Sequence, residues 1–177
     1  MVKIPSKITA SYLENAAIYY LQRFASSSVN LRRVLLRKIQ RSAAHWGDEV
    51  EALLPLLDPV IAKMSELGYL NDAAYAGQKL RALHRQGKGE RVIRAALAAK
   101  GILAAQTDQA WQDFSQDEPD ADRSAAWSLA RKRRLGPFRP AEIRAEYRAK
   151  DLAAMGRAGF GYATAAAIID AEETEIP

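Results

Sequence analysis

Basic side chains recur in three groups along the chain, at spacings that place several of them on one face of a helix. In the first group, Arg33, Arg37 and Arg41 follow one another at i, i+4 and i+8, away from the apolar residues of a predicted helix. Arginine-rich faces can neutralise phosphates or match an acidic groove on a protein. The second and third groups are Arg81, Arg85, Lys88, Arg91, Arg94 and Lys100, and then Arg131, Lys132, Arg133, Arg134, Arg144 and Arg148.

Any one of these groups has a simpler explanation, which is a solvated helix face that happens to be basic. Three groups in matching places along the chain favour a surface that binds a partner. The Gly87-Lys88-Gly89 turn opens a helix whose N-terminus can hold an anion. The spacing of a nucleotide-binding P-loop is missing there, so an ordinary turn is the better interpretation.

The residues that would carry catalysis or bind a metal are missing or scattered. The chain has no cysteine, which excludes disulfides and thiolate chemistry. Its histidines, His45 and His84, lie far apart in the sequence and outside any metal-binding spacing. No serine lies in a G-x-S-x-G elbow. We therefore predict a binding protein that is not an enzyme and that uses no cofactor or metal.

Charge alternates along the chain in a way that indicates a repeated unit. The formal net charge is +5, but successive blocks ending at residues 47, 78, 101, 122, 150 and 177 carry +7, −5, +6, −6, +7 and −4. No stretch of about 18 uncharged apolar residues could span a membrane, and Glu14 and Asn15 interrupt what would be the core of a signal peptide. We expect a soluble, monomeric, cytoplasmic protein.

Apolar residues recur at helical spacing and no segment alternates with period two, so we predict helices and no sheet. Ser11 and Glu14 form a capping box for a first helix that runs to about residue 24. A second helix ends near Gly47 and buries Leu31, Val34, Leu35 and Ile39. A third, capped by Asp48, begins late or is kinked because of Pro55 and Pro59.

A helix capped by Asn71 or Asp72 is expected to run to about Arg85, and another follows the Gly87-Lys88-Gly89 turn and ends at Lys100-Gly101. Further helices are expected over residues 103–114, 123–135 and 140–157, with a last one ending near Glu172. The segment 115–122 is polar and is therefore predicted to be a linker. Tyr69 is a candidate to lock a junction between units. For most aromatic residues core packing is a better interpretation than base stacking; these are Tyr12, Tyr19, Tyr20, Tyr75, Trp111, Trp127 and Tyr147.

A short motif repeats at intervals of about 60 residues. Leu97-x-x-Lys100-Gly101-Ile102 has a relaxed copy in Met155-x-x-Ala158-Gly159-Phe160 and a poorer one in Leu35-x-x-Lys38-Ile39. Helices this short are marginal alone and must pack against one another. The predicted fold is all-α, with three tandem three-helix modules forming an elongated, curved helical-repeat array. Its modules are residues 1–68, 69–116 and 117–177, the last with a short acidic tail.

One stretch of the middle module resembles a known family. The run Leu67-Gly68-Tyr69-Leu70-Asn71-Asp72-Ala73-Ala74-Tyr75-Ala76 is similar to the G-Y-L-[DN]-D-x-x-[FY]-A signature of RecX regulatory proteins. Arg85-Gln86-Gly87 and Leu97-x-x-Lys100-Gly101-Ile102 follow at the family's spacing, and the flanks agree more loosely. The first module lacks the usual Lys-Gly, and the third has Ala158 in place of lysine.

The resemblance implies a negative regulator of the RecA recombinase. Such a protein lies in the groove of the RecA filament on single-stranded DNA, blocks its extension and lowers its ATPase, strand-exchange and coprotease activities. That places it in recombination, DNA repair and the SOS response. The alternative is an autonomous helical protein that binds single- or double-stranded DNA. The basic groups would contact RecA or DNA, and reversing Arg91 and Arg94 to glutamate should weaken inhibition without loss of helix.

Overall fold

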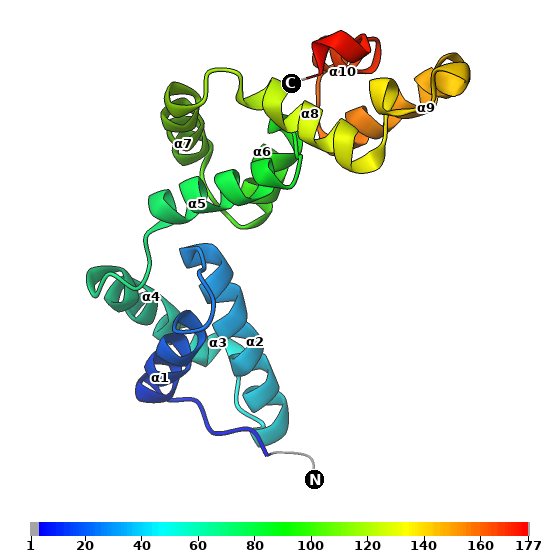
Figure 1. The fold of residues 1–177 in the computed structure, drawn as a ribbon. Helices are drawn as coiled ribbons and strands as arrows, with labels where there is room; N and C mark the ends of the chain where they lie inside the picture. Colours follow the sequence, from blue (N-terminus) through cyan, green and yellow to red (C-terminus); the bar gives the residue numbers. More distant parts are fainter. Residues whose placement is uncertain (1–3, 177) are drawn as a thin grey trace. The chain divides into compact units, whose positions relative to one another are not determined.

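The computed structural model describes residues 4–176, and every regular element in that range is a helix, which confirms the all-α class (Figure 1). The chain divides into two compact units. The first comprises the residues up to Tyr75 together with Lys100–Ile102, and the second comprises Ala76–Ala99 and the residues from Leu103 onward. The three-module division ending at residues 68, 116 and 177 remains a prediction.

The α-helices of the first unit are α1 (Ala10–Leu21), α2 (Ser28–Trp46), α3 (Val50–Leu53) and α4 (Leu57–Glu66). Helix α5 (Asp72–Arg85) begins in this unit and continues in the second. The second unit also holds α6 (Glu90–Ala99), α7 (Ala104–Asp117), α8 (Ala121–Arg133), α9 (Arg144–Ala158) and α10 (Tyr162–Ile169).

Helices α1, α2 and α4 form the core of the first unit. Leu31, Leu35 and Ile39 recur at every fourth position of α2 and are fully buried, as their spacing predicts. They pack in one cluster with Leu13 of α1 and Met64 of α4. Burying each of these large aliphatic side chains contributes about 1.5–3 kcal/mol, which offsets the weak intrinsic stability of such short helices.

The ends of the first helices differ partly from expectation. Helix α1 begins at Ala10 because Thr9 is its N-cap and accepts a hydrogen bond from the Tyr12 amide at 3.1 Å, so the capping box at Ser11 is wrong. It also ends at Leu21 rather than near residue 24. Helix α2 ends at Gly47 in the left-handed conformation, as predicted.

Pro55 interrupts the third helix, as predicted, whereas Pro59 lies within the first turn of α4 and does not break it. Pro55 lies in a 3₁₀ turn (Leu54–Leu56) between α3 and α4, because proline has no amide hydrogen to continue the α-helical pattern. The N-cap of α3 is Glu49 and makes no side-chain capping bond, so Asp48 is not the cap that the sequence suggested.

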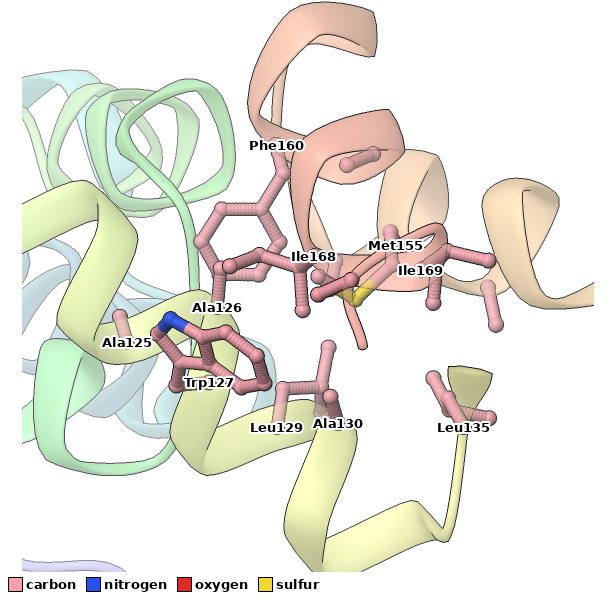
Figure 2. Close-up of a cluster of buried hydrophobic side chains, with 14 residues drawn as sticks. Ala125, Ala126, Trp127, Leu129, Ala130, Leu135, Met155, Phe160, Ile168 and Ile169 are labelled. Atoms are coloured by element: carbon pink, nitrogen blue, oxygen red, sulfur yellow. The ribbon is translucent and has the colours of Figure 1, made fainter. Parts of the chain in front are cut away.

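In the second unit, α8, α9 and α10 surround one cluster of buried side chains. Trp127 and Leu129 of α8, Met155 of α9 and Ile168 of α10 all belong to it (Figure 2). Trp127 is only 6% exposed, which confirms its predicted place in the core, whereas Tyr19 is 62% exposed and the same prediction is wrong there. Tyr69 is likewise exposed.

The repeated motif marks equivalent helix ends in two of its three copies. Gly101 after α6 and Gly159 after α9 both have a positive φ, +79° and +103°. The apolar residues of both copies are buried, namely Leu97, Ile102, Met155 and Phe160. The copy at Leu35 lies inside α2, so it shares the burial but not the helix end.

Three boundaries in the second unit differ from the predicted ones. Helix α7 continues to Asp117 and α8 starts at Ala121, so the linker is only residues 118–120. Before α9, residues Ala141–Ile143 form a 3₁₀ turn. Helix α10 ends at Ile169, three residues before the predicted end.

Candidate partner-binding surface

The first basic group lies on the solvent side of α2. Arg33, Arg37 and Arg41 are exposed, while the inward-pointing side chains two positions away from them, Leu31, Leu35 and Ile39, are fully buried. Ser27 fixes the start of this helix by accepting a hydrogen bond from the Asn30 amide at 3.2 Å. We call these three arginines the α2 basic face.

One end of the α2 basic face adjoins exposed apolar side chains. A hollow of about 280 Å³ is lined by Ile4, Pro5, Ser6, Tyr12, Lys38 and Arg41. Nearby on α2, Trp46 is 48% exposed and donates from Nε1 to the Pro5 carbonyl at 2.9 Å. Arginine beside an exposed tryptophan and a half-buried tyrosine is the composition that protein–protein interfaces favour.

Two arginines of the second group are engaged in ion pairs inside the second unit. Arg94 bridges Glu90 on its own helix at 2.6 Å and Asp108 on α7 at 2.5 Å. The hydrogen bond to Asp108, followed by that to Glu90, raises the pKa of the Arg94 guanidinium. Arg81 pairs with Asp117 at 3.0 Å. These contacts join α5 and α6 to α7 (Figure 1).

Three further basic residues also have partners within the fold. Arg91 donates to the Gly156 carbonyl. Arg144 donates to the carbonyls of Arg139 at 3.0 Å and Pro137 at 2.8 Å. Arg148 holds both carboxylate oxygens of Asp170 at 2.6 and 2.7 Å, and this pair lowers the pKa of the Asp170 carboxyl.

The consecutive group Arg131, Lys132, Arg133 and Arg134 lies where α8 ends, and all four are exposed. We call it the basic corner. The Arg131 guanidinium lies 5.8 Å from the centre of the Phe138 ring. Arg134 terminates the helix in the left-handed conformation, with φ 54° and ψ 53°.

The structure thus divides the fifteen predicted contact residues into those that already bind a partner within the fold and those that have none among the described residues. In the first unit Lys100 donates from Nζ to the Asn30 side chain at 3.2 Å. Among residues 4–176, seven of the fifteen have no ion pair, side-chain hydrogen bond or ring contact, so they are available to a partner: Arg37, Arg41, Arg85, Lys88, Lys132, Arg133 and Arg134.

The most deeply buried ion pair among the described residues was not predicted from the sequence. Asp151 of α9 is 1% exposed and accepts hydrogen bonds from Arg139 at 2.7 and 2.8 Å and from the Gly136 amide at 2.9 Å. Burial alone would raise the pKa of the Asp151 carboxyl, but these hydrogen bonds outweigh it and lower the pKa. The available signal was spacing, because Asp151 precedes Ala154, Met155 and Ala158 on the buried face of α9.

Neither histidine lies in a metal-binding arrangement within the described residues. His84 is buried, bonds to the Ala121 carbonyl through Nε2 at 2.5 Å and lies against the Phe114 ring. Over residues 4–176 no group of three histidine, aspartate or glutamate side chains could hold a metal ion. In the same range, no helix has the length and apolar character needed to cross a membrane.

The sequence matches known proteins along most of its length. It is 41% identical over 169 residues to the regulatory protein RecX of Myxococcus xanthus strain DK1622, covering 95% of this chain and 89% of the relative. The chain belongs to the RecX family. A second RecX, from Agrobacterium fabrum strain C58, is 29% identical to this chain. That match spans 93% of this chain and 85% of the relative.

Two further comparisons agree with RecX membership. The family model of the RecX second three-helix domain matches residues 71–110, the segment where the sequence resemblance is strongest. A crystal structure of a regulatory protein RecX has the same fold, with a TM-score of 0.63 and 22% identity. The match covers 92% of this chain and 72% of the other.

Proposed function

We propose that this RecX family protein is a negative regulator of the RecA recombinase. It binds in the groove of the RecA filament on single-stranded DNA, blocks filament extension and lowers the ATPase, strand-exchange and coprotease activities. It acts in the cytoplasm as a monomer, by binding rather than catalysis. The observation that carries the proposal is the match to regulatory proteins RecX over 95% of the chain.

The α2 basic face supports this proposal as the surface that contacts the RecA protein. Arg37 and Arg41 have no ion pair within the described residues, so binding does not first require breaking one. Exposed Trp46 and the neighbouring hollow add apolar contact area, which an interface with protein needs at its centre.

The deciding experiment is RecA ATP hydrolysis on single-stranded DNA, titrated with this protein, beside a naked-DNA binding measurement. We expect inhibition at well below one molecule per RecA. The Arg37→Glu/Arg41→Glu variant should require much more protein for the same inhibition. A control with the same change of charge is Arg123→Glu/Lys150→Glu, which alters exposed residues outside the predicted contact set.

Unchanged hydrolysis together with tight binding to naked DNA would reject the regulator and support the alternative, an autonomous DNA-binding protein. Equal inhibition by both double variants would leave RecA regulation standing and reject the α2 basic face as the contact surface.

A further inference from the structure

The first turns of α2 and α6 are each held by a carboxylate from the start of a later helix. The Ser28 amide, at the first position of α2, donates to Asp72 of α5 at 2.8 Å, and the Ser28 hydroxyl donates to the same oxygen at 3.2 Å. The Glu90 amide, at the first position of α6, donates to Asp122 of α8 at 3.4 Å. We call the arrangement around Ser28 the first joint and the arrangement around Glu90 the second joint.

In both joints a helix-ending glycine lies against the same first turn. A Cβ on Gly101, which follows α6, would lie 2.5 Å from the Val29 Cγ1 atom of the first joint. A Cβ on Gly159, which follows α9, would lie 2.8 Å from the Val92 nitrogen of the second joint. The two helix starts are 62 residues apart and the two glycines are 58 residues apart, which are the intervals of the repeated motif. The two joints therefore repeat one arrangement, and each lies within one compact unit.

The first joint is closed mainly by side chains. The Ser27 hydroxyl donates to the Lys100 carbonyl. The Lys100 ammonium donates from Nζ to the Asn30 side chain at 3.2 Å. Lys100, Asn30 and Asp72 are half-buried, so water reaches these groups and competes for their hydrogen bonds. A hydrogen bond that merely replaces one to water adds little net stability, and this joint is therefore weakly closed.

The second joint is closed by main chain and by apolar contact. Gly89 stands where the first joint has Ser27, and the Gly89 amide donates to the Ala158 carbonyl at 2.9 Å. Val92 and Ala158 stand in place of the polar pair of the first joint. Gly89, Ala158 and Gly159 are buried, so this hydrogen bond is shielded from water. Opening the second joint would leave buried backbone groups without a partner, which is costly.

We propose that the first joint opens and recloses in the native protein while the second joint stays closed. Opening transfers the hydrogen-bonding groups of Ser28, Asp72 and Lys100 to water, which satisfies them. The chain then has one adjustable and one fixed connection along its repeats. Lys100, which the sequence suggested as a partner contact, acts here inside the protein. The inference goes beyond regulation of RecA, because it concerns the chain alone and holds whether or not RecA is its partner.

The test measures hydrogen–deuterium exchange of single amides in the full chain by NMR spectroscopy. The Ser28 amide reports on the first joint and the Gly89 amide on the second. We expect the protection factor of Ser28 to be about tenfold lower than that of Gly89. Lys100→Ala should lower the Ser28 value roughly fivefold further and leave Gly89 unchanged. Lys100→Arg keeps a donor at this position and should retain most of the protection.

Lys38→Ala is the matched control, because Lys38 is also a half-buried lysine of the first unit and lies on α2 outside the joint. It should leave both protection factors unchanged. Equal protection of Ser28 and Gly89 in the parent protein would overturn the proposal. So would an unchanged Ser28 value in Lys100→Ala. An equal fall at both amides in that variant would also reject the proposal, because the two joints would then open together.

Discussion

The backbone of Gly89 lies directly against the backbone of Gly159. A Cβ on Gly89 would come within 2.7 Å of the Gly159 carbonyl carbon, and one on Gly159 would come within 2.8 Å of the Val92 nitrogen. The Gly89 amide donates to the Ala158 carbonyl at 2.9 Å. The turn before α6 and the turn after α9 thus meet through main-chain contacts, and neither glycine position has room for a side chain.

We expect Gly89→Ala to lower the free energy of unfolding by about 1–3 kcal/mol, because the added methyl group meets backbone that cannot move aside cheaply. Gly156→Ala is the control. Gly156 lies inside α9 with nothing within 4 Å of a Cβ, so alanine there should stabilise the helix by roughly 0.5–1 kcal/mol. Urea unfolding followed by circular dichroism measures both. Equal effects would show that the close approach carries no energy.

The buried Arg139–Asp151 pair should contribute more to the stability of the fold than any exposed pair. Asp151→Ala leaves the Arg139 guanidinium and the Gly136 amide without their acceptor, at a cost of about 3 kcal/mol. Asp151→Asn keeps one acceptor oxygen and should cost about half as much. The exposed pair Arg148–Asp170 provides the comparison, and its Asp170→Asn variant should change the unfolding midpoint far less. Comparable losses at the two sites would contradict this assignment.

Acid should destabilise the protein partly through the same carboxylate. The pKa of Asp151 is lower in the folded than in the unfolded chain, so its contribution is complete above the ordinary aspartate pKa of about 3.9. That contribution is lost as the pH falls through the folded value. The free energy of unfolding should therefore decline below about pH 4, and less steeply in Asp151→Asn. Parallel pH profiles would be inconsistent with this role.

Reversal of Arg94, which the sequence suggested as a test of partner binding, should first damage the fold. Arg94→Glu would place a third carboxylate beside Glu90 and Asp108 and remove the link between α6 and α7. We expect the free energy of unfolding to fall by roughly 1–2 kcal/mol, which is less than for a buried pair because these groups are partly exposed to water. Arg85→Glu, an exposed change without such partners, should leave thermal unfolding nearly unchanged. Similar melting curves for the two variants would refute the structural role of Arg94.

The left-handed conformation of Arg134 should carry a measurable stability cost. Arg134→Gly relieves it and should raise the free energy of unfolding by about 1 kcal/mol. Arg133→Gly changes the last residue of α8, which has a helical backbone, and should instead lower the free energy of unfolding by up to about 1 kcal/mol, because glycine loses more backbone freedom on entering a helix. Thermal unfolding of the pair provides the comparison. If both variants were less stable than the parent protein, Arg134 would not be strained.

The sequence by itself determined the all-helical class and most of the helix core. Leu31, Leu35 and Ile39 are buried at their predicted spacing, and Gly101 and Gly159 end helices at the predicted positions. These features are local: a 3.6-residue period selects the buried face, and only glycine adopts a positive φ without cost. The resemblance over residues 67–102 likewise led to the family, because its motif is a contiguous string.

Only the tertiary structure decided which basic residues are available to a partner. Arg94 and Arg37 look alike in the sequence, yet Arg94 is paired with Asp108, fourteen residues further on, whereas Arg37 has no ion pair among the described residues. The Arg139–Asp151 pair and the contact between Gly89 and Gly159 likewise join different elements. A charge on a helix face is set by local sequence, but its partner depends on which other helix packs beside it, and that is fixed by the whole core.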